Sequence, residues 1–259
     1  MGTAEKERLV VLVCMFIDIS HWGELFKKPD WYISIVPELE AIKAKARAVS
    51  EIEKEEAAEK VYSFFEQKLK GGEIVLGDEI GNWDVERKPI DTIVVHHTEA
   101  DPGMTLDRLS AMTLARLYAT YYARPYDARD AVISGKVISS GHVRDGRQIF
   151  WPYHWLVRMD GSVVQLLQDS EIGWHAGNWD INCRSIAIAL DNNYLNSKPS
   201  EIVLKAVATI IESHYSFVPK ERIYGHREVR LGEPTTCPSN LFLSSGERKG
   251  WKEDLLDLI

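Results

Sequence analysis

The chain has 259 residues, of which 45% are hydrophobic and 27% are charged, as is typical of a soluble globular protein with one large or two small domains. This composition excludes disordered, collagen-like and membrane-spanning proteins. Lysine and arginine total 31 and aspartate and glutamate total 39, so the net charge of −8 disfavours non-specific binding to nucleic acid or anionic lipid, both of which need a basic surface.

An apolar run of nine residues, LVVLVCMFI, occupies positions 9–17. A membrane-spanning helix needs about 20 apolar residues, so this run predicts a buried strand and no membrane span. The charge-balanced EKER before the run and the polar residues after it do not form a secretory signal, which needs a positive leader and a small-residue cleavage site. We therefore expect cytoplasmic synthesis, with release or export by another route.

Residues 37–70 are rich in glutamate, lysine and alanine, and their apolar residues recur at helical spacing. The Gly71-Gly72 pair suits the end of a helix. The pattern predicts one long helix, or two helices with a break near Ser50. We assign residues 1–88 to an N-terminal extension, a strand plus a long helix, whose function the sequence does not indicate.

The pattern changes at Pro89. Residues 90–97, IDTIVVHH, are β-branched and apolar and predict a buried strand that ends in two histidines. Residues 105–122 carry an apolar stripe at helical spacing and predict a helix. Residues 124–148 contain Pro125 and several glycines and predict an irregular loop, which is long enough to shape a cleft.

Two further strands are predicted at residues 153–159 and 162–167. Asp160-Gly161 joins them into a hairpin, because Asp-Gly fits the primed turns that connect twisted strands. Residues 185–191, SIAIALD, predict a central strand whose small alanines allow close packing.

Ser200 is placed to cap a helix whose apolar stripe runs through residues 203–211. Strands and helices therefore alternate after Pro89, which predicts an α/β fold for a second domain at residues 89–259. The chain contains no internal repeat.

Three residues far apart in the sequence, His96, His226 and Cys237, offer ligands for a metal ion. Zinc prefers nitrogen and sulfur ligands, and a catalytic zinc keeps three protein ligands and one open position. Glycine and proline between His226 and Cys237 favour a loop that folds back over the metal. Histidines and cysteines are more often core or surface residues, so the spacing alone leaves the assignment open.

Four groups of motifs occur in order: TIVVHHT at 92–98, YHWLVRMDG at 153–161, WHAGN at 174–178 with SIAI at 185–188, and GHREV at 225–229 with TTCP at 235–238. Together they resemble the zinc-dependent N-acetylmuramoyl-L-alanine amidase family, which includes phage lysozyme-type amidases and peptidoglycan recognition proteins. The resemblance runs from about residue 89 to residue 242 and leaves residues 1–88 uncovered.

The resemblance implies an α/β fold with a central mixed β-sheet flanked by helices, here with a helical N-terminal extension. It also implies one Zn²⁺ ion, held by His96, His226 and Cys237. Side chains alternate along a strand, so His97 would point to the opposite face, where we expect a structural residue.

The resemblance further identifies catalytic and substrate-binding residues. Tyr153 would donate a hydrogen bond to the developing oxyanion, and His175 would bind the substrate or stabilise the transition state in the same cleft. Thr235 stands where some family members carry lysine, so it supplies a hydroxyl without adding positive charge. Trp174 and Asn178 are candidate walls of the substrate groove.

These features predict an amidase that hydrolyses the bond between N-acetylmuramic acid and L-alanine in peptidoglycan or its fragments, an endolysin-like form of cell wall degradation. Peptidoglycan or a muropeptide is the expected partner, and the oligomeric state stays open.

Two alternatives remain. One is a noncatalytic module that binds muropeptide through the same groove, although relatives that only bind commonly lack the cysteine that is present here as Cys237. The other is a structural zinc site in an unrelated α/β protein, which would need a fourth ligand such as Cys183 or Asp191.

Overall fold

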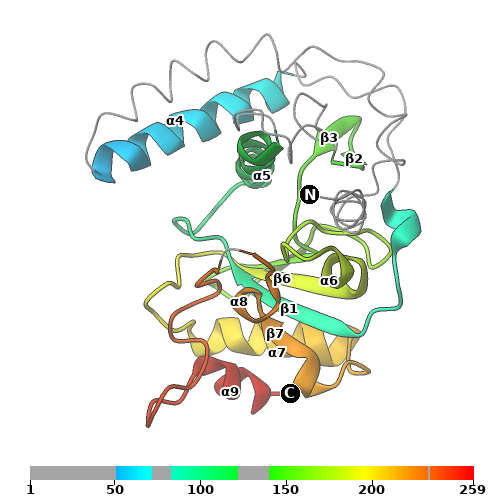
Figure 1. Ribbon diagram of the computed structural model, residues 1–259, viewed down its shortest axis with the longest axis vertical. Helices are drawn as coiled ribbons and strands as arrows, with labels where there is room; N and C mark the ends of the chain where they lie inside the picture. The colour runs from blue at the N-terminus through cyan, green and yellow to red at the C-terminus, as the bar shows by residue number, and fades with distance from the viewer. Residues whose placement is uncertain (1–50, 72–82, 122–139, 233) are drawn as a thin grey trace, which may run out of the picture. The chain divides into compact units, whose positions relative to one another are not determined.

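The computed structural model describes residues 51–71, 83–121, 140–232 and 234–259 (Figure 1). These residues form two compact units. One unit combines the described residues up to Trp83 with those of Thr105–Phe150, and the other combines Asp84–Met104 with the described part of Trp151–Ile259. Each compact unit therefore contains two separate segments of the chain. The sequence pattern instead predicts a single domain boundary between residues 88 and 89.

The first unit pairs two helices, α4 (Glu51–Lys70) and α5 (Leu106–Tyr121). Arg108 of α5 joins them, because its guanidinium forms ion pairs with Glu59 at 2.8 Å and with Glu66 at 3.0 Å. Both helices agree with the predicted spacing, and α4 ends directly before the Gly71-Gly72 pair. The strand expected at 9–17 and the part of the helical pattern at 37–50 lie outside the described residues.

Part of the loop expected at 124–148 is instead a hairpin, in which β2 (His142–Arg144) pairs antiparallel with β3 (Arg147–Ile149). Its turn, Asp145-Gly146, has positive φ at both residues, 52° and 72°, as a two-residue type I′ turn requires. The Asp-Gly signal was present in the sequence. The short strands HVR and RQI lack the apolar alternation that would have identified them as strands.

The second unit is built on a five-stranded sheet with strand order β5-β4-β6-β1-β7. Its strands are β1 (Thr92–His97), β4 (Trp155–Val157), β5 (Val163–Gln165), β6 (Ser185–Leu190) and β7 (Ile223–Gly225). β1 is parallel to both β6 and β7, β4 is parallel to β6, and β5 alone is antiparallel to its neighbour in this sheet. The fold is therefore α/β with a mixed central sheet, as the resemblance implies.

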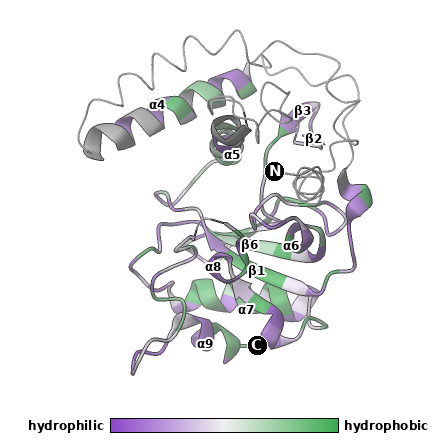
Figure 2. Cartoon of the chain, viewed as in Figure 1, coloured by the Kyte–Doolittle hydropathy of each residue, from purple (hydrophilic) through white to green (hydrophobic). Residues whose placement is uncertain are grey.

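One face of this sheet holds the main hydrophobic core. Residues alternate along β1, so Ile93 and Val95 pack with α7 (Glu201–His214), whereas Val94 faces the opposite layer with Ala176 and Val229. Figure 2 shows the apolar character of β1, β6 and α7. Because side chains alternate along a strand, His96 lies on the same face of β1 as Val94, opposite the main core.

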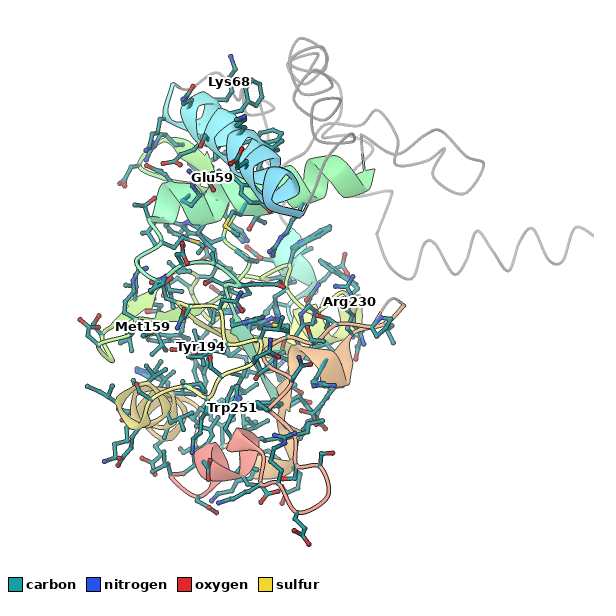
Figure 3. The ribbon with its side chains drawn as sticks, turned by 90° about the vertical axis from the view of Figure 1, so that its left-hand side faces the viewer. Glu59, Lys68, Met159, Tyr194, Arg230 and Trp251 are labelled. Atoms are coloured by element: carbon teal, nitrogen blue, oxygen red, sulfur yellow. The ribbon has the colours of Figure 1, made fainter. Side chains whose placement is uncertain are left out.

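Short helices complete both layers: α6 (Trp179–Arg184) and α8 (His226–Val229) border the Val94 face, and α9 (Trp251–Leu256) packs beside α7. Trp251 of α9 is fully buried in the main core, where its ring meets Phe242 edge-on at 4.5 Å between centroids. Figure 3 shows Trp251 and Tyr194 inside this unit and the exposed Met159 at its rim. Ser200 lies at the N-cap of α7 as predicted, without a side-chain hydrogen bond to the helix.

The predicted hairpin around Asp160-Gly161 is present, but its turn is longer than expected. The Arg158 N–H donates to the Ser162 carbonyl at 2.8 Å, and only Gly161 in this loop has positive φ, 83°. A type I′ turn would need positive φ at both central residues. Asp160 instead accepts hydrogen bonds from the N–H and the hydroxyl of Ser162, which favours a three-residue loop.

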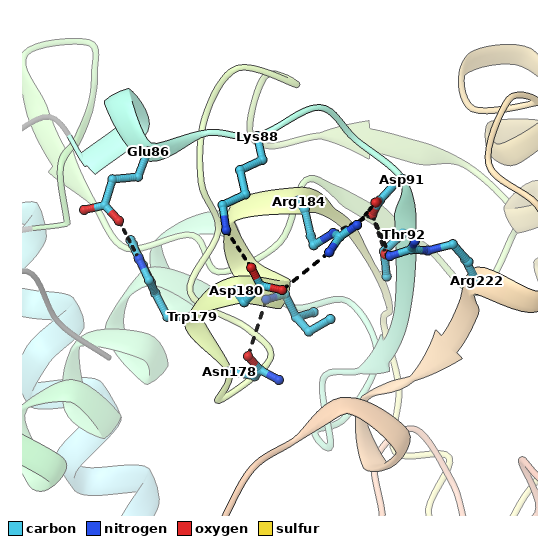
Figure 4. A network of polar contacts seen from close by, with 10 residues as sticks. Glu86, Lys88, Asp91, Thr92, Asn178, Trp179, Asp180, Arg184 and Arg222 are labelled. Carbon is cyan, nitrogen blue, oxygen red and sulfur yellow. Dashed lines mark hydrogen bonds and ion pairs between the residues drawn. The ribbon is translucent and has the colours of Figure 1, made fainter. Parts of the chain in front are cut away.

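A charged network ties the start of β1 to its neighbours (Figure 4). The Asp91 carboxylate accepts hydrogen bonds from Arg184 of α6 at 2.8 Å and from Arg222, just before β7, at 2.9 Å. Lys88 pairs with Asp180 of α6 at 2.6 Å. Each pair is partly exposed and contributes little alone, but together they connect the segments that carry β1, β6 and β7.

In the part of the chain that the structure describes, no helix combines the length and apolar character needed to cross a membrane.

Candidate metal centre

The pairing of two neighbouring parallel strands brings two histidines together. Val95 of β1 lies opposite Gly225 of β7, so the next residues, His96 and His226, follow side by side at the carboxyl edge of the sheet. Their ring centroids are 4.7 Å apart. Cys237 joins them from the loop after α8, with its Sγ 3.7 Å from Nδ1 of His96.

These three residues, called here the His-His-Cys cluster, place their ligand atoms within 4.8 Å of one another. Two imidazole nitrogens and a sulfur are ligands that zinc prefers, and tetrahedral Zn–N and Zn–S bonds separate nitrogen and sulfur by roughly 3.6 Å. The observed 3.7 Å between His96 and Cys237 fits this spacing. His96 is 1% and Cys237 8% exposed. A zinc ion bound between them would therefore replace most of its water ligands with protein atoms. The donor set and the spacing both fit zinc.

Arg227 connects the two segments that carry His226 and Cys237. Its backbone N–H donates to the Cys237 carbonyl at 2.8 Å, and its guanidinium donates to the Ser239 carbonyl at 3.0 Å. Both bonds lock the cysteine loop onto α8. This explains how the ten residues between the two ligands, which comprise most of α8 and the loop after it, bring His226 and Cys237 back to one point in space.

Glu228 holds the start of α8 through contacts with Gly225 and Lys252. Its carboxylate accepts a hydrogen bond from the Gly225 N–H at 2.7 Å and pairs with Lys252 of α9 at 2.8 Å. The Lys252 ammonium also lies over the ring of Tyr224, 5.3 Å from its centroid. Glu228 is therefore engaged in holding the residue before His226.

Tyr153 lies beside the cluster. Its ring centroid is 5.0 Å from that of His96, and the residue is 6% exposed. Thr235 also reaches the cluster, because its hydroxyl accepts a hydrogen bond from the Cys237 N–H at 3.2 Å. The structure therefore brings both predicted oxyanion donors into the neighbourhood of the predicted ligands.

His175 lies behind His96. Its Nδ1 is 2.9 Å from Nε2 of His96, and its Nε2 is 3.0 Å from the hydroxyl of Ser185. Burial lowers the pKa of His175 well below its ordinary value, with the nearby His154 and His226 adding to the effect, so the ring is neutral at pH 7. Both ring nitrogens thus face protein groups, and this favours support of His96 over direct contact with substrate.

The two predicted groove residues occupy the segment before α6. Asn178 is the N-cap of α6, accepting a hydrogen bond from the Ile181 N–H and donating one to the Val229 carbonyl at 3.2 Å. Trp174 packs edge-on against Trp179, with 5.3 Å between ring centroids. Asn178 therefore joins α6 to α8, and contact of either residue with substrate stays a prediction.

Neither candidate for a fourth ligand belongs to the cluster. Cys183 lies in α6, and burial raises the pKa of its thiol to about 12, with the charge of Glu86 adding to the effect. Asp191 accepts hydrogen bonds from the Gly103 N–H at 2.9 Å and from the Arg158 guanidinium at 2.5 Å. Among the described residues the cluster has three members, the number found at catalytic zinc sites.

A family model described as N-acetylmuramoyl-L-alanine amidase matches residues 86–240, more than half of the chain, and this span contains the whole cluster. The chain belongs to the N-acetylmuramoyl-L-alanine amidase family. A search of curated proteins finds no significant match.

Several solved structures resemble this amidase-family chain at low identity. The endolysin N-acetylmuramoyl-L-alanine amidase LysCS from Clostridium intestinale is 20% identical, with 67% of this chain and 85% of that chain covered and a TM-score of 0.42. An AmpD derivative is 19% identical, with 59% and 79% covered and a TM-score of 0.39. Drosophila peptidoglycan recognition protein SD is 20% identical, with 62% and 78% covered and a TM-score of 0.35.

Sequence reasoning missed polar residues that lie around the cluster of this amidase-family site. Arg227 lies inside the GHREV motif and Ser185 opens the SIAI motif, but the motifs alone assign neither residue a role. Their position inside these motifs was the only sign in the sequence that they lie near the site. Their partners lie on other segments of the chain, which a single sequence does not pair.

Gly225→Ala is expected to damage the centre by crowding. A Cβ at this position would lie 2.5 Å from a ring atom of Phe242 and 2.7 Å from Cδ of Pro238, and the Phe242 ring is fully buried. We expect the free energy of unfolding to fall by about 1–3 kcal/mol, as is typical of overpacking, and zinc binding to weaken because Pro238 follows Cys237. Urea unfolding and chelator competition measure the two effects. Wild-type values in both would show that the glycine is dispensable.

Proposed function

We propose that the protein is a zinc-dependent amidase that hydrolyses the bond between N-acetylmuramic acid and L-alanine in peptidoglycan or its fragments. The His-His-Cys cluster carries this proposal, because three zinc-type ligands converge at the carboxyl edge of the sheet within the family-matched span. Family membership supports the choice of bond. Peptidoglycan or a muropeptide is the proposed partner.

His96, His226 and Cys237 would hold the metal. Zinc at such a site polarises a carbonyl and lowers the pKa of water toward ~7, which supplies hydrolytic chemistry at neutral pH. Tyr153 donates its phenol hydrogen to the oxyanion that develops on the substrate carbonyl. Its low exposure makes such a hydrogen bond stronger than it would be in water.

Thr235 acts twice in this proposal. Its oxygen accepts the Cys237 N–H and so orders the ligand loop, and its hydrogen remains a donor for the substrate oxygen. Because it carries no charge, its contribution to oxyanion stabilisation is smaller than that of a lysine. Trp174 offers an aromatic, half-buried surface to the substrate, and Asn178 orders the segment that presents it.

Mass spectrometry of a defined muropeptide after incubation with purified protein tests the proposal. We expect release of the intact stem peptide with a free L-alanine amine, loss of this product on chelation and its return with zinc. An unchanged muropeptide from folded, zinc-loaded protein would overturn the enzyme assignment. Binding of the uncut muropeptide by the same protein would then identify a recognition module.

A further inference from the structure

The side chains of His96, His175 and Ser185 form a hydrogen-bonded line that leads away from the metal centre. Nδ1 of His96 faces Cys237 Sγ at 3.7 Å, and Nε2 of the same ring lies 2.9 Å from Nδ1 of His175. Nε2 of His175 lies 3.0 Å from Oγ of Ser185. Of these residues, Ser185 is the one to which neither the family motif nor the proposed chemistry gives a task.

If His96 held the metal through Nδ1, the atom that faces Cys237, the positions of the ring hydrogens along this line would follow. The ring then carries its hydrogen on Nε2, which donates to Nδ1 of His175. Because Nδ1 of His175 accepts this bond, the hydrogen of that ring lies on Nε2, which donates it to Ser185 Oγ. The serine oxygen is the final acceptor, so the arrangement leaves no N–H of either ring without a partner.

We propose that Ser185 is a positioning residue for the metal ligand His96 and acts through His175. Outer hydrogen-bond partners of this kind orient a ligating imidazole and select its tautomer. Ser185 is fully buried and His175 is 6% exposed, so solvent does not readily replace the hydroxyl. The inference rests on the proposed function, because it concerns the same metal centre.

The surroundings of Ser185 explain how it can hold a ring in place. Ser185 is the first residue of β6, and its carbonyl accepts a hydrogen bond from the Arg87 guanidinium at 3.0 Å. The side chain of Asn182 accepts from the backbone N–H groups of His175 and Ala176, at 3.2 and 2.8 Å. The junction of α6 and β6 therefore holds both the backbone and the ring of His175.

Thr92 provides a matched control. It lies directly opposite Ser185 in the register of β1 and β6, and its hydroxyl is equally buried. That hydroxyl donates to Asp91 at 2.8 Å and accepts from Arg222 at 2.9 Å, in the network at the start of β1. Thr92→Val thus removes a buried hydroxyl from the same layer without touching the line to His96.

Zinc affinity, measured by chelator competition, and the absorption spectrum of the cobalt-substituted protein test the inference without an activity assay. We expect Ser185→Ala to weaken zinc binding about 10- to 100-fold and to alter the cobalt spectrum. Thr92→Val should keep wild-type values in both. In a His175→Ala background, Ser185→Ala should cause no further loss, because the serine acts through that ring. Wild-type affinity in Ser185→Ala, or losses that add, would overturn the inference.

Nitrogen-15 ring shifts of His96 and His175 in the metal-free protein separate this inference from the proposed function. We expect both sets of shifts to change in Ser185→Ala and to stay constant in Thr92→Val. Unchanged shifts in Ser185→Ala would refute the line even if the wild type is an active zinc amidase. A wild type that binds no zinc but shows the shift changes would refute the function and retain the Ser185–His175–His96 line.

Discussion

Replacing Cys237 by alanine is expected to abolish hydrolysis and to lower zinc affinity by at least about 100-fold. Zinc sites with four ligands bind with about 10–16 kcal/mol, so a single ligand is worth roughly 3 kcal/mol, a factor of about 100. Cys237 also supplies the one sulfur of the cluster, and its backbone is bonded to Arg227. Metal analysis of the purified variant and the muropeptide assay measure the two losses.

Cys183→Ala is the control for this experiment. Cys183 is also a buried cysteine, 1% exposed, but it lies in α6 and its high thiol pKa keeps it protonated at pH 7. We expect this variant to bind zinc and to hydrolyse muropeptide as the wild type does. Equal losses in the two variants would point to general destabilisation, and full activity of Cys237→Ala would refute the metal centre.

Replacing Tyr153 by phenylalanine is expected to lower kcat by about 100- to 1,000-fold with zinc still bound, the cost typical of removing one oxyanion donor. The ring that packs 5.0 Å from His96 is retained, so the ligand keeps its neighbour. A change in kcat without loss of metal separates the role of the phenol hydroxyl from that of the ligands. Steady-state kinetics and metal content, measured on the same preparation, test the expectation.

Tyr194→Phe serves as the matched control for Tyr153→Phe. Tyr194 is also buried, at 3% exposure, but its hydroxyl contacts the sulfur of Met159 at 3.1 Å, and its backbone N–H donates to His97 on the opposite face of β1. We expect no change in kcat. If Tyr153→Phe were as active as this control, the proposed donor to the oxyanion would have to be another group.

The sequence alone predicted four of the five strands of the second unit, its helix α7 and the three residues of the cluster. Strand β1 follows from a β-branched run, and the alternation of side chains along it separates His96 from His97. These signals are local, because they depend on neighbours a few residues away. The ordered motifs then pointed to the family that the model match shows, over residues 86–240.

The tertiary structure decided what surrounds each cluster residue. The register that sets Val95 opposite Gly225 places His96 beside His226, and the same fold puts His175 behind His96. Asn178 proves to cap α6, a task that the WHAGN motif did not reveal. Strand register and loop return join residues up to 141 positions apart, as between His96 and Cys237, and such contacts depend on the packing of the whole sheet.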